Sequence, residues 1–455
     1  MIDTTLPGFD VEAVWDGACR ILEQVGLEVA TGKALARPAR ELPVRGGRVC
    51  FPREMIEHYA GEIRQKAARC APAPRSSVTM CNSAVCHHYL HPITGETRPY
   101  DTETLIRHTR LACRLGDEGL LLGRATGYPL DVPPRMQFLT SYFVECCHSR
   151  SPASHCLITD EVAMKYMMEI AAVMGHAQMI GVEPISPLKF AGASVDIAVA
   201  HGRADLIIGV DAMPIMGITA PLDWHAAWAQ SVAECLGTYA LLRLCGCERI
   251  EPPSFRLFMP NMATAKIYLS SPRHIFALLT RRKVREFFAL ATDSSELMLV
   301  SGAAPDHHAA VEKAAGCLLS KLFGFYVVEG AGNLRIDEVF SPQQLLIDLE
   351  ICNFVNSIGA EFGRAGQDLV ETVREGVARG NFLDTSLTLD HFGEFFWRPV
   401  LFDLSAQATR NAKGLLAKAA EWAERKTAEH DYQLEGDKRR QLERIMAEAR
   451  QALAA

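Results

Sequence analysis

The stretch DLIIGVDAMPIMGITAPLDWH, Asp205–His225, decides the fold prediction, because it joins a strand to a helix through a loop rich in Met, Pro and Trp. DLIIGV is a short, uninterrupted apolar run, which is typical of a strand buried on both faces of a parallel sheet. The segment HAAWAQSVAECLGTYALLRLC that follows has the periodicity of a helix. The loop between them places Met213, Met216, Trp224 and His225 just beyond the end of the strand.

Short apolar runs alternate with helical segments through the middle of the chain. The runs are GLLLGRATG, SHCLIT, PLKFAGA, DLIIGVDAMPIMG, FRLFMP, EFFALATD and GFYVVEGAG. Such alternation predicts an α/β fold built on a parallel sheet. The number of runs favours a TIM (β/α)8 barrel with one strand overlooked, and a doubly wound open sheet is the alternative. No Gly-rich dinucleotide fingerprint follows any run, which disfavours a nucleotide-binding open sheet.

The two ends of the chain differ from this middle part. Residues 1–110 predict a mostly helical extension, with one helix from Val11 to Val25 and another in PREMIEHYAGEIRQKA, where Pro52 suits a first turn. Residues 111–398 carry the strand–helix units and are predicted to form the barrel domain. Residues 399–455 are rich in Ala, Glu, Lys and Arg, and predict a tail of two surface helices.

Composition excludes several classes of protein. The 455 residues are 49% hydrophobic and 22% charged, as in ordinary globular proteins. A net charge of -7 disfavours nucleic-acid binding, and the short basic run Arg281–Lys283 is interpreted as a solvated helix face. The chain contains no long apolar stretch and no secretory pattern, so we expect a cytoplasmic protein that does not enter a membrane. Its 14 cysteines are then expected to be reduced, buried thiols.

The loops at the carboxyl ends of barrel strands build the active sites of this fold. Met213, Met216, Trp224 and His225 are therefore candidates for the wall of a pocket that binds a small organic cation or a flat ligand. The alternative is that such residues belong to the core. For Trp228 on the following helix the core alternative is favoured, whereas for the two methionines both alternatives remain open.

Glu329 is the one acid on the apolar run YVVEGAG. A carboxylate at the end of a barrel strand can attract a cation or act as a base. A solvated strand end or a salt-bridge partner is the alternative.

Two groups of cysteines and histidines, Cys81–His91 and Cys146–His148, have zinc-ligand types without paired zinc-finger spacing, so we expect no metal site there. The GxSxG and Walker phosphate-loop patterns are absent from the sequence, which disfavours hydrolase and kinase activities.

Seven segments between about Val11 and Phe402 resemble, in order, the trimethylamine methyltransferase family. They are WDGACRILEQVGLEV, HPITGETRP, PLDVPPRM, ISPLKF, MPIMGITAPL, EGAGNLRIDEVFSPQQLLIDLEI and GNFLDTSLTLDHFGEFFWRPVLFD. The resemblance implies a TIM barrel that passes a methyl group from a methylated amine to the cobalt of a cobalamin carried by a separate corrinoid protein. The DxHxxG corrinoid-binding signature is absent, because the triplets Asp223–His225 and Asp306–His308 lack the following Gly.

The resemblance also assigns site residues. It places Met213–Pro221 at the barrel mouth, facing the substrate and the incoming corrinoid. No residue occupies the role of pyrrolysine, so the chain is similar to the branch without it, whose members favour quaternary amines such as glycine betaine. Glu329 stands where the family usually has a His before GAG, and the family's HFLxHPHT pattern is reduced to Asn381-Phe382-Leu383 with Ser386.

Together these observations predict a corrinoid-dependent methyltransferase that moves a methyl group from a quaternary or other methylated amine to the Co(I) cobalamin of a partner corrinoid protein. The predicted catalytic residue is Glu329. The predicted substrate-binding residues are Met213, Met216, Trp224, His225, Asn333 and Asn381. We also expect a homo-oligomer. The alternatives are a non-catalytic paralogue that binds a methylamine or a corrinoid protein, and a metal-dependent barrel enzyme that uses the Cys and His residues near Cys86.

Overall fold

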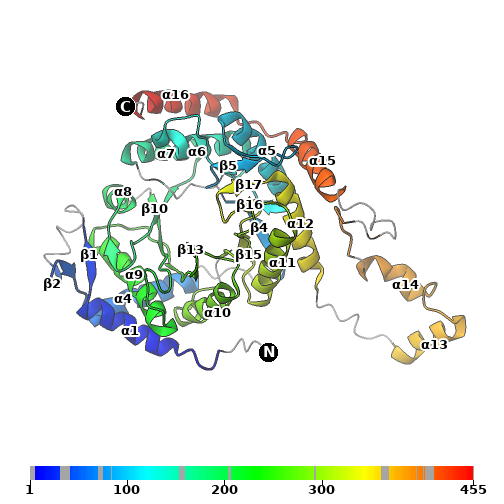
Figure 1. The fold of residues 1–455 in the computed structure, drawn as a ribbon, viewed down its shortest axis with the longest axis horizontal. Coiled ribbons are helices and arrows are strands. Elements are labelled where there is room, and N and C mark those ends of the chain that lie inside the picture. Colours follow the sequence, from blue (N-terminus) through cyan, green and yellow to red (C-terminus); the bar gives the residue numbers. More distant parts are fainter. Residues whose placement is uncertain are drawn as a thin grey trace.

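Helices surround a central group of short strands in the computed structural model (Figure 1). The described residues are 6–30, 41–69, 75–83, 85–152, 158, 160–202, 206–291, 294–359, 368–395, 397–402, 404 and 414–453. The central strands are β4 Thr79–Cys81, β7 Leu121–Leu122, β8 Gln178–Val182, β10 Leu206–Ala212, β11 Ser254–Phe255, β14 Ser294–Ser295 and β15 Val327–Glu329. They form two arcs of parallel strands, β14-β15-β4-β7 and β11-β10-β8. Around the two arcs the strands follow chain order and return to β4, as in a TIM barrel, so the predicted fold class is confirmed.

Four of the predicted runs contain or adjoin a barrel strand: GLLLGRATG holds β7, DLIIGV holds β10, FRLFMP adjoins β11, and GFYVVEGAG holds β15. In EFFALATD only Glu286 and Phe287 are helical, as the end of α10 (Pro272–Phe287), and β14 begins at Ser294. PLKFAGA was wrong as a barrel strand, because its strand β9 (Lys189–Phe190) pairs with β1 (Leu27–Val29) in a separate sheet. SHCLIT lies, except for Ile158, outside the described residues.

The sequence prediction overlooked β4 and β8. Strand β8, QMIGV, has only five residues, begins with the polar Gln178 and carries Gly181 on its barrel-facing side. Its apolar pattern is therefore weak. Strand β4 pairs with both β15 and β7, although it precedes residue 111. The parallel sheet therefore begins within the segment that was predicted to be an N-terminal extension.

The first part of the chain packs against the side of the barrel. It contains α1 Val11–Gln24, α4 Arg53–Arg69, and the small sheet β2 Val44–Arg45, β3 Arg48–Val49, β1 and β9. Helix α1 lies along α9 (Trp224–Leu244). Gly237 of α9 permits this contact, because an added Cβ would lie 2.5 Å from the Leu27 side chain and 2.8 Å from the Leu22 side chain. The two predicted N-terminal helices are confirmed.

Helix α9, which follows the Met-rich loop, is buried on nearly all sides. It lies against α1, α4 and strand β10 and forms much of the largest apolar core. Trp228 is fully buried there, and its Nε1 donates a hydrogen bond to Thr280 Oγ1 of α10 (Pro272–Phe287) at 2.9 Å. The core interpretation of Trp228 is confirmed.

The remaining helices form the outer layer, and short hairpins cap the strand ends. The helices are η1 Pro134–Met136, α5 Thr102–Asp117, α6 Gln137–His148, α7 Glu161–Met174, α8 Ala193–His201, α11 His307–Leu322 and α12 Pro342–Ser357. The hairpin strands are β5 His88–Leu90, β6 Thr97–Pro99, β12 Pro260–Asn261, β13 Lys266–Ile267, β16 Asn333–Leu334 and β17 Val339–Phe340. The predicted turn HPITGETRP is the connection between β5 and β6 and leads into α5.

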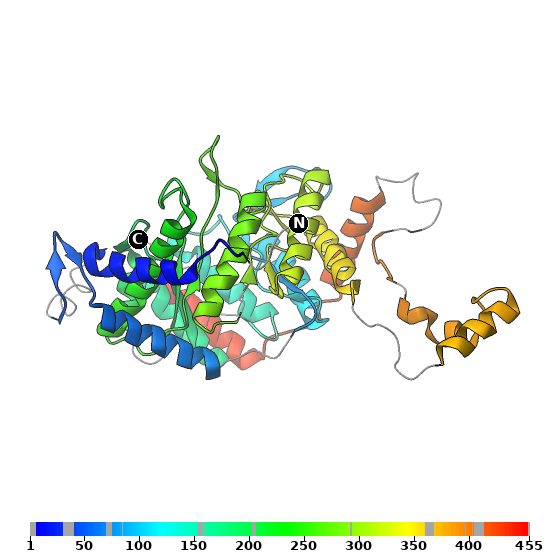
Figure 2. The same ribbon diagram turned by 90° about the horizontal axis from the view of Figure 1, so that it is seen from below.

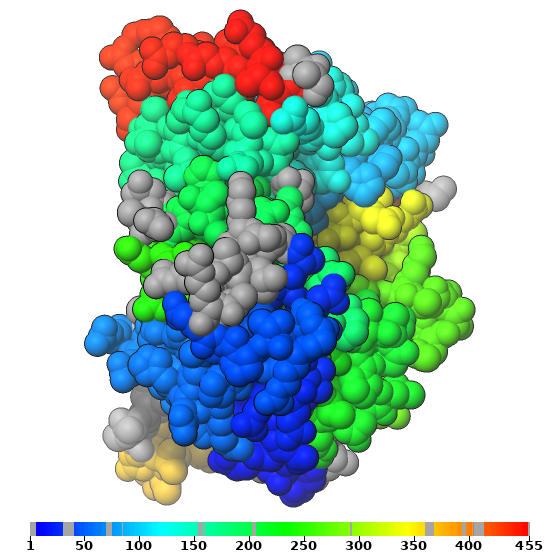
Figure 3. Space-filling view, turned by 90° about the vertical axis from the view of Figure 1, so that its left-hand side faces the viewer, coloured from blue at the N-terminus to red at the C-terminus, as the bar shows by residue number. Residues whose placement is uncertain are grey.

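The C-terminal tail forms the two predicted helices, α15 Gly414–Ala428 and α16 Gly436–Leu453. Helix α15 packs on α12 and α5, and α16 packs on α7. In the space-filling view the tail covers α6 and α7 at one end of the molecule (Figure 3).

An arm built from α13 Leu369–Arg379, α14 Ser386–His391 and η2 Phe392–Phe395 extends away from the barrel (Figure 2). Most of its apolar side chains are exposed: Leu369, Val370, Val373, Val377, Phe382, Leu383, Leu389 and Phe392. The sequence prediction had placed this segment inside the barrel domain.

Within the described ranges, no helix combines the length and the apolar character that crossing a membrane requires. The described cysteines are free thiols, and all of them except Cys245 are buried.

Candidate active site

The strand residues alternate between the helix layer and the barrel interior. In β10, Leu206, Ile208 and Val210 are buried, whereas Ile207, Gly209 and Asp211 are less so. Because side chains alternate along a strand and helices cover its outer face, the second set faces the interior.

The ladders extend this assignment to the neighbouring strands. Val210 pairs with Val182, so Glu183 follows on the same face as Asp211. Asp211 pairs with Ser254, two residues before Arg256. On the opposite arc Glu329 pairs with Cys81, and Cys81 pairs with Leu122, two residues before Arg124. Among the described residues, the register thus turns five charged side chains toward the interior at the carboxyl ends of the strands: Arg124, Glu183, Asp211, Arg256 and Glu329.

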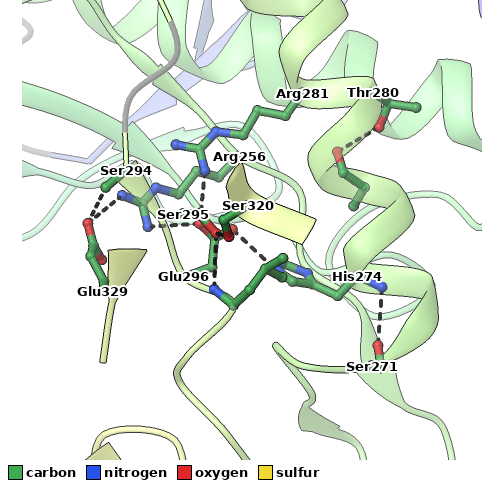
Figure 4. A network of polar contacts seen from close by, with 12 residues as sticks. Arg256, Ser271, His274, Thr280, Arg281, Ser294, Ser295, Glu296, Ser320 and Glu329 are labelled. Carbon is green, nitrogen blue, oxygen red and sulfur yellow. Dashed lines mark hydrogen bonds and ion pairs between the residues drawn. The ribbon is translucent and has the colours of Figure 1, made fainter. Parts of the chain in front are cut away.

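Arg256 connects acids from three other strand ends. Figure 4 shows its contacts with two of them, Glu296 and Glu329. Its Nε lies 3.0 Å from Asp211 Oδ2, and its Nη2 lies 3.8 Å from Glu329 Oε1. Its Nη1 lies 4.0 Å from Glu296 Oε2, directly after β14. Glu329 also accepts a short hydrogen bond from Ser294 Oγ. Glu329 is therefore a salt-bridge partner of Arg256, as the alternative interpretation from the sequence expects.

Glu296 joins this arrangement to α10, which supplies its two closest charged partners. It is 3% exposed and contacts Arg281 Nη1 at 2.9 Å and His274 Nε2 at 3.1 Å. Burial would raise the pKa of Glu296, but Arg281 and the hydrogen bond from His274, with a smaller effect of Arg256, lower that pKa below its ordinary value. The interpretation of Arg281 as part of a solvated helix face was wrong, because α10 turns this side chain toward Glu296, where it is 2% exposed.

Glu183 is the inward-facing acid without a bonded partner in the described part of the chain. Its side chain is half-buried at the end of β8. Burial raises the pKa of Glu183, and the positive charge of Arg256 partly opposes that shift. The register of β8, β10 and β11 turns Glu183 and Arg256 toward the same interior.

The turn after Glu329 is fixed from behind by a buried ion pair. Lys313 and Asp348 are fully buried, and Lys313 Nζ lies 2.7 Å from Asp348 Oδ2. Lys313 also donates to Gly330 O at 2.8 Å, and Asp348 accepts from Gly332 N at 2.7 Å. Gly330 has φ +108° and packs so closely that an added Cβ would lie 2.6 Å from the carbonyl carbon of Met298, which explains the glycine.

The Met-rich loop divides between core and surface. Met216 is buried, and its backbone N donates to Phe258 O at 3.0 Å, whereas Met213 is 39% exposed. Trp224 packs edge-on against Phe276 of α10. His225 stacks on Phe9 and its Nε2 accepts a hydrogen bond from Asp10 N at 3.1 Å.

Two further predicted residues lie elsewhere. Asn333 is buried and its Nδ2 lies 3.4 Å from Cys86 Sγ. Asn381 is exposed on the arm, where its Oδ1 accepts from Leu383 N at 2.8 Å. Within the described residues, the polar partners of Glu329 are Ser294 and Arg256, so none of the six predicted binding residues is bonded to Glu329.

The acids and the arginine around Glu329 were not among the residues predicted from the sequence. A signal was present, because Glu183, Asp211 and Arg256 each stand within or directly after an apolar run, at the place where Glu329 stands in its own run. The signal is weak in isolation, since only the register of the strands shows that these residues share one face.

No group of three His, Cys, Asp or Glu residues could hold a metal ion in the part of the chain that the structure describes. Burial raises the pKa of Cys81 to about 12, with a further contribution from Glu329, so this thiol is protonated at neutral pH. Burial also raises the pKa of Cys86. These sulfurs behave as small apolar groups.

The family model for trimethylamine methyltransferase (MTTB) matches residues 5–453. The chain is 26% identical over 207 residues to trimethylamine methyltransferase MttB2 of Methanosarcina mazei, which covers 44% of this chain and 40% of that relative. It is 28% identical over 174 residues to trimethylamine methyltransferase MttB1 of the same organism, covering 37% of this chain and 34% of the relative. The chain thus spans two fifths or less of the length of these relatives.

Two solved structures are similar at lower levels. The hydroxylamine complex of MtmB has a TM-score of 0.42 at 10% identity, covering 91% of this chain and 92% of that one. The monomethylamine methyltransferase MtmB of Methanosarcina barkeri has a TM-score of 0.38 at 11% identity, covering 92% of this chain and 99% of that one.

Proposed function

Because the chain belongs to the trimethylamine methyltransferase family, we propose that it transfers a methyl group from a methylated amine to the cobalamin of a partner corrinoid protein. The observation that carries the proposal is the charge of the barrel interior. Among the residues that the structure describes, three inward-facing carboxylates, Glu183, Asp211 and Glu329, oppose the two guanidinium groups of Arg124 and Arg256, an excess of one negative charge. A half-buried site with that balance favours a cation.

A quaternary ammonium is the cation that we propose. Its nitrogen has no lone pair, so a protein group cannot activate it by protonation. The chain must instead hold one methyl group toward the open end of the barrel and keep water away from the charged nitrogen. The carboxylates would bind the cation, while the Lys313–Asp348 pair keeps the Glu329 turn in place.

Cobalamin would come from a partner protein. When bound, it supplies a Co(I) nucleophile, which is chemistry that amino-acid side chains lack. The histidines of the two DxH triplets do not fit a resident cobalt, because His225 accepts from Asp10 N at 3.1 Å and His308 lies 3.0 Å from Glu312 Oε1. A pulldown with a purified corrinoid protein tests this point, and no association at any substrate concentration would contradict it.

We also propose that the protein forms a homo-oligomer through the arm of residues 368–395. The exposed apolar side chains of α13 and α14 support this, because a monomer rarely exposes such a group to water. Asn381 would then act at the partner copy or at the interface rather than at its own barrel.

A non-catalytic binding protein is the second candidate. The contact of Glu329 with Arg256 favours it, because a neutralised carboxylate attracts a cation less strongly. An assay of methyl transfer to reduced cobalamin separates the two, because only the enzyme consumes Co(I) in the presence of a methylated amine.

A further inference from the structure

We propose that Glu183, rather than Glu329, is the carboxylate that binds the positive charge of the substrate. This inference rests on the proposed function, since it assigns the cation of a methylated amine to one acid in the barrel interior. The three inward-facing acids differ in the groups that already neutralise them.

Asp211 and Glu329 both have a cationic neighbour. Arg256 lies 3.0 Å from Asp211 and 3.8 Å from Glu329, and Ser294 donates a hydrogen bond to Glu329. A substrate cation would have to compete with a guanidinium that is already in place and only 14% exposed. These two acids therefore hold Arg256.

Glu183 has no such neighbour within the described residues. It stands at the end of β8, beside Asp211 at the end of β10, and its side chain is half-buried. Arg256 reaches it only through a long-range electrostatic effect. Its carboxylate is therefore held in a partly desolvated space without a bonded counter-charge, and a cation that enters this space would supply one.

The arrangement divides the barrel interior by role. Arg256 is held in place by three carboxylates, so it provides a fixed positive charge on the side of β11, β14 and β15. Glu183 forms a negative element on β8, and Arg124 contributes a second positive charge near Cys81. A cation bound at Glu183 lies between these groups, and the interior then carries balanced charge.

The test measures binding of choline, a small quaternary ammonium, to the full chain by calorimetry. The matched neutral probe is 3,3-dimethyl-1-butanol, which has the same shape with carbon in place of the charged nitrogen. The variants are Glu183→Gln, Glu183→Asp and Glu329→Gln, and the control is Glu448→Gln on exposed α16, which changes net charge equally. Circular dichroism and thermal unfolding verify that each variant is folded.

We expect Glu183→Gln to weaken choline binding by about tenfold or more and to leave binding of the alcohol unchanged. Glu183→Asp should restore part of the affinity, and Glu329→Gln should weaken binding less than Glu183→Gln does. Three results would overturn the assignment: no binding of choline to the wild type, unchanged binding in Glu183→Gln, or a larger loss in Glu329→Gln.

Kinetics separate this inference from the proposed function. If the wild type methylates reduced cobalamin and Glu183→Gln does so with unchanged KM for the amine, the inference fails and the methyltransferase remains. If choline binding depends on Glu183 while the wild type transfers no methyl group from any amine, the binding site remains and the methyltransferase fails.

Discussion

Arg256 Nε lies 3.0 Å from Asp211 Oδ2, so the ends of the neighbouring strands β10 and β11 are joined by an ion pair inside the barrel. The same guanidinium reaches Glu329 and Glu296 across β14 and β15. One arginine thus organises acids from three other strand ends.

Replacing Arg256 with Met should destabilise the protein by about 3–5 kcal/mol, because partly buried acids would lose their counter-charge. Arg256→Lys should recover only part of this loss, since an ammonium cannot reach several carboxylates in the way a guanidinium does. Urea unfolding of the three proteins gives the comparison. Equal stability of all three would show that the contacts of Arg256 are not important for the fold.

Glu329→Gln keeps the shape of the side chain and removes its charge. Because Glu329 holds Arg256 beside the proposed substrate site, we expect methyl transfer to fall by about tenfold or more while the fold is retained. Initial rates with purified corrinoid protein measure the effect. Glu429→Gln, on the distant C-terminal tail, is the control for a general effect of charge. A wild-type rate in Glu329→Gln would remove this residue from the site.

Lys313→Met leaves Asp348 charged in the core and should cost about 3–5 kcal/mol of stability. The double variant, Lys313→Met with Asp348→Asn, should recover part of the lost stability. The side-chain oxygen of the introduced asparagine can still accept the hydrogen bond from Gly332 N, and no unpaired charge remains in the core. Chemical unfolding of the two single variants and the double variant gives the coupling energy. Strict additivity would argue against a coupled pair.

His108 gives the protein a pH dependence that is independent of the site. Burial lowers the pKa of His108 to about 3, whereas the unfolded residue has a pKa of about 6.5. Below pH ~6.5 the unfolded chain takes up a proton that the folded chain refuses, so stability falls toward pH 3 by about 1.4 kcal/mol per pH unit. His108→Gln should show a shallower decline in its free energy of unfolding. Parallel curves for variant and wild type would contradict this.

Substituting Val373, Val377 and Leu383 of the arm with Ser should reduce self-association, because these exposed apolar groups are the proposed interface. Light scattering after size-exclusion chromatography gives the mass of each species. Triple substitution of Lys438, Arg439 and Arg440 with Ser, in the first turn of α16 away from its buried side chains, is the surface control. An oligomer of unchanged mass in the arm variant would place the interface elsewhere.

Periodicity and turn residues were enough to predict the fold class, the first helices and the two tail helices. They failed for β8 and β9, which are both short and near each other in the chain. Strand β8 carries Gly181 on its inner face, and β9 is a two-residue strand in another sheet. The local sequence pattern therefore could not show which of the two belongs to the barrel. Strand β4 was missed because three residues are too few to give a period.

The site was predicted less completely than the fold. Glu329 was proposed because it interrupts an apolar run, but its contact with Arg256 depends on the relative register of strands far apart in the sequence. Trp224 and His225 stand in a loop that follows a barrel strand, yet α10 and the N-terminal segment take up their side chains. Long-range packing, which a single sequence does not display, decided both outcomes.

The most direct test of the account is a Co(I) methylation assay with this protein, reduced cobalamin on a purified corrinoid protein, and a panel of quaternary and other methylated amines. The account predicts loss of the Co(I) absorbance and formation of methylated cobalamin with at least one quaternary amine, and a much slower reaction with Glu329→Gln. Unchanged Co(I) absorbance with every amine, from a folded protein that binds the corrinoid partner, would contradict the proposed methyltransferase activity.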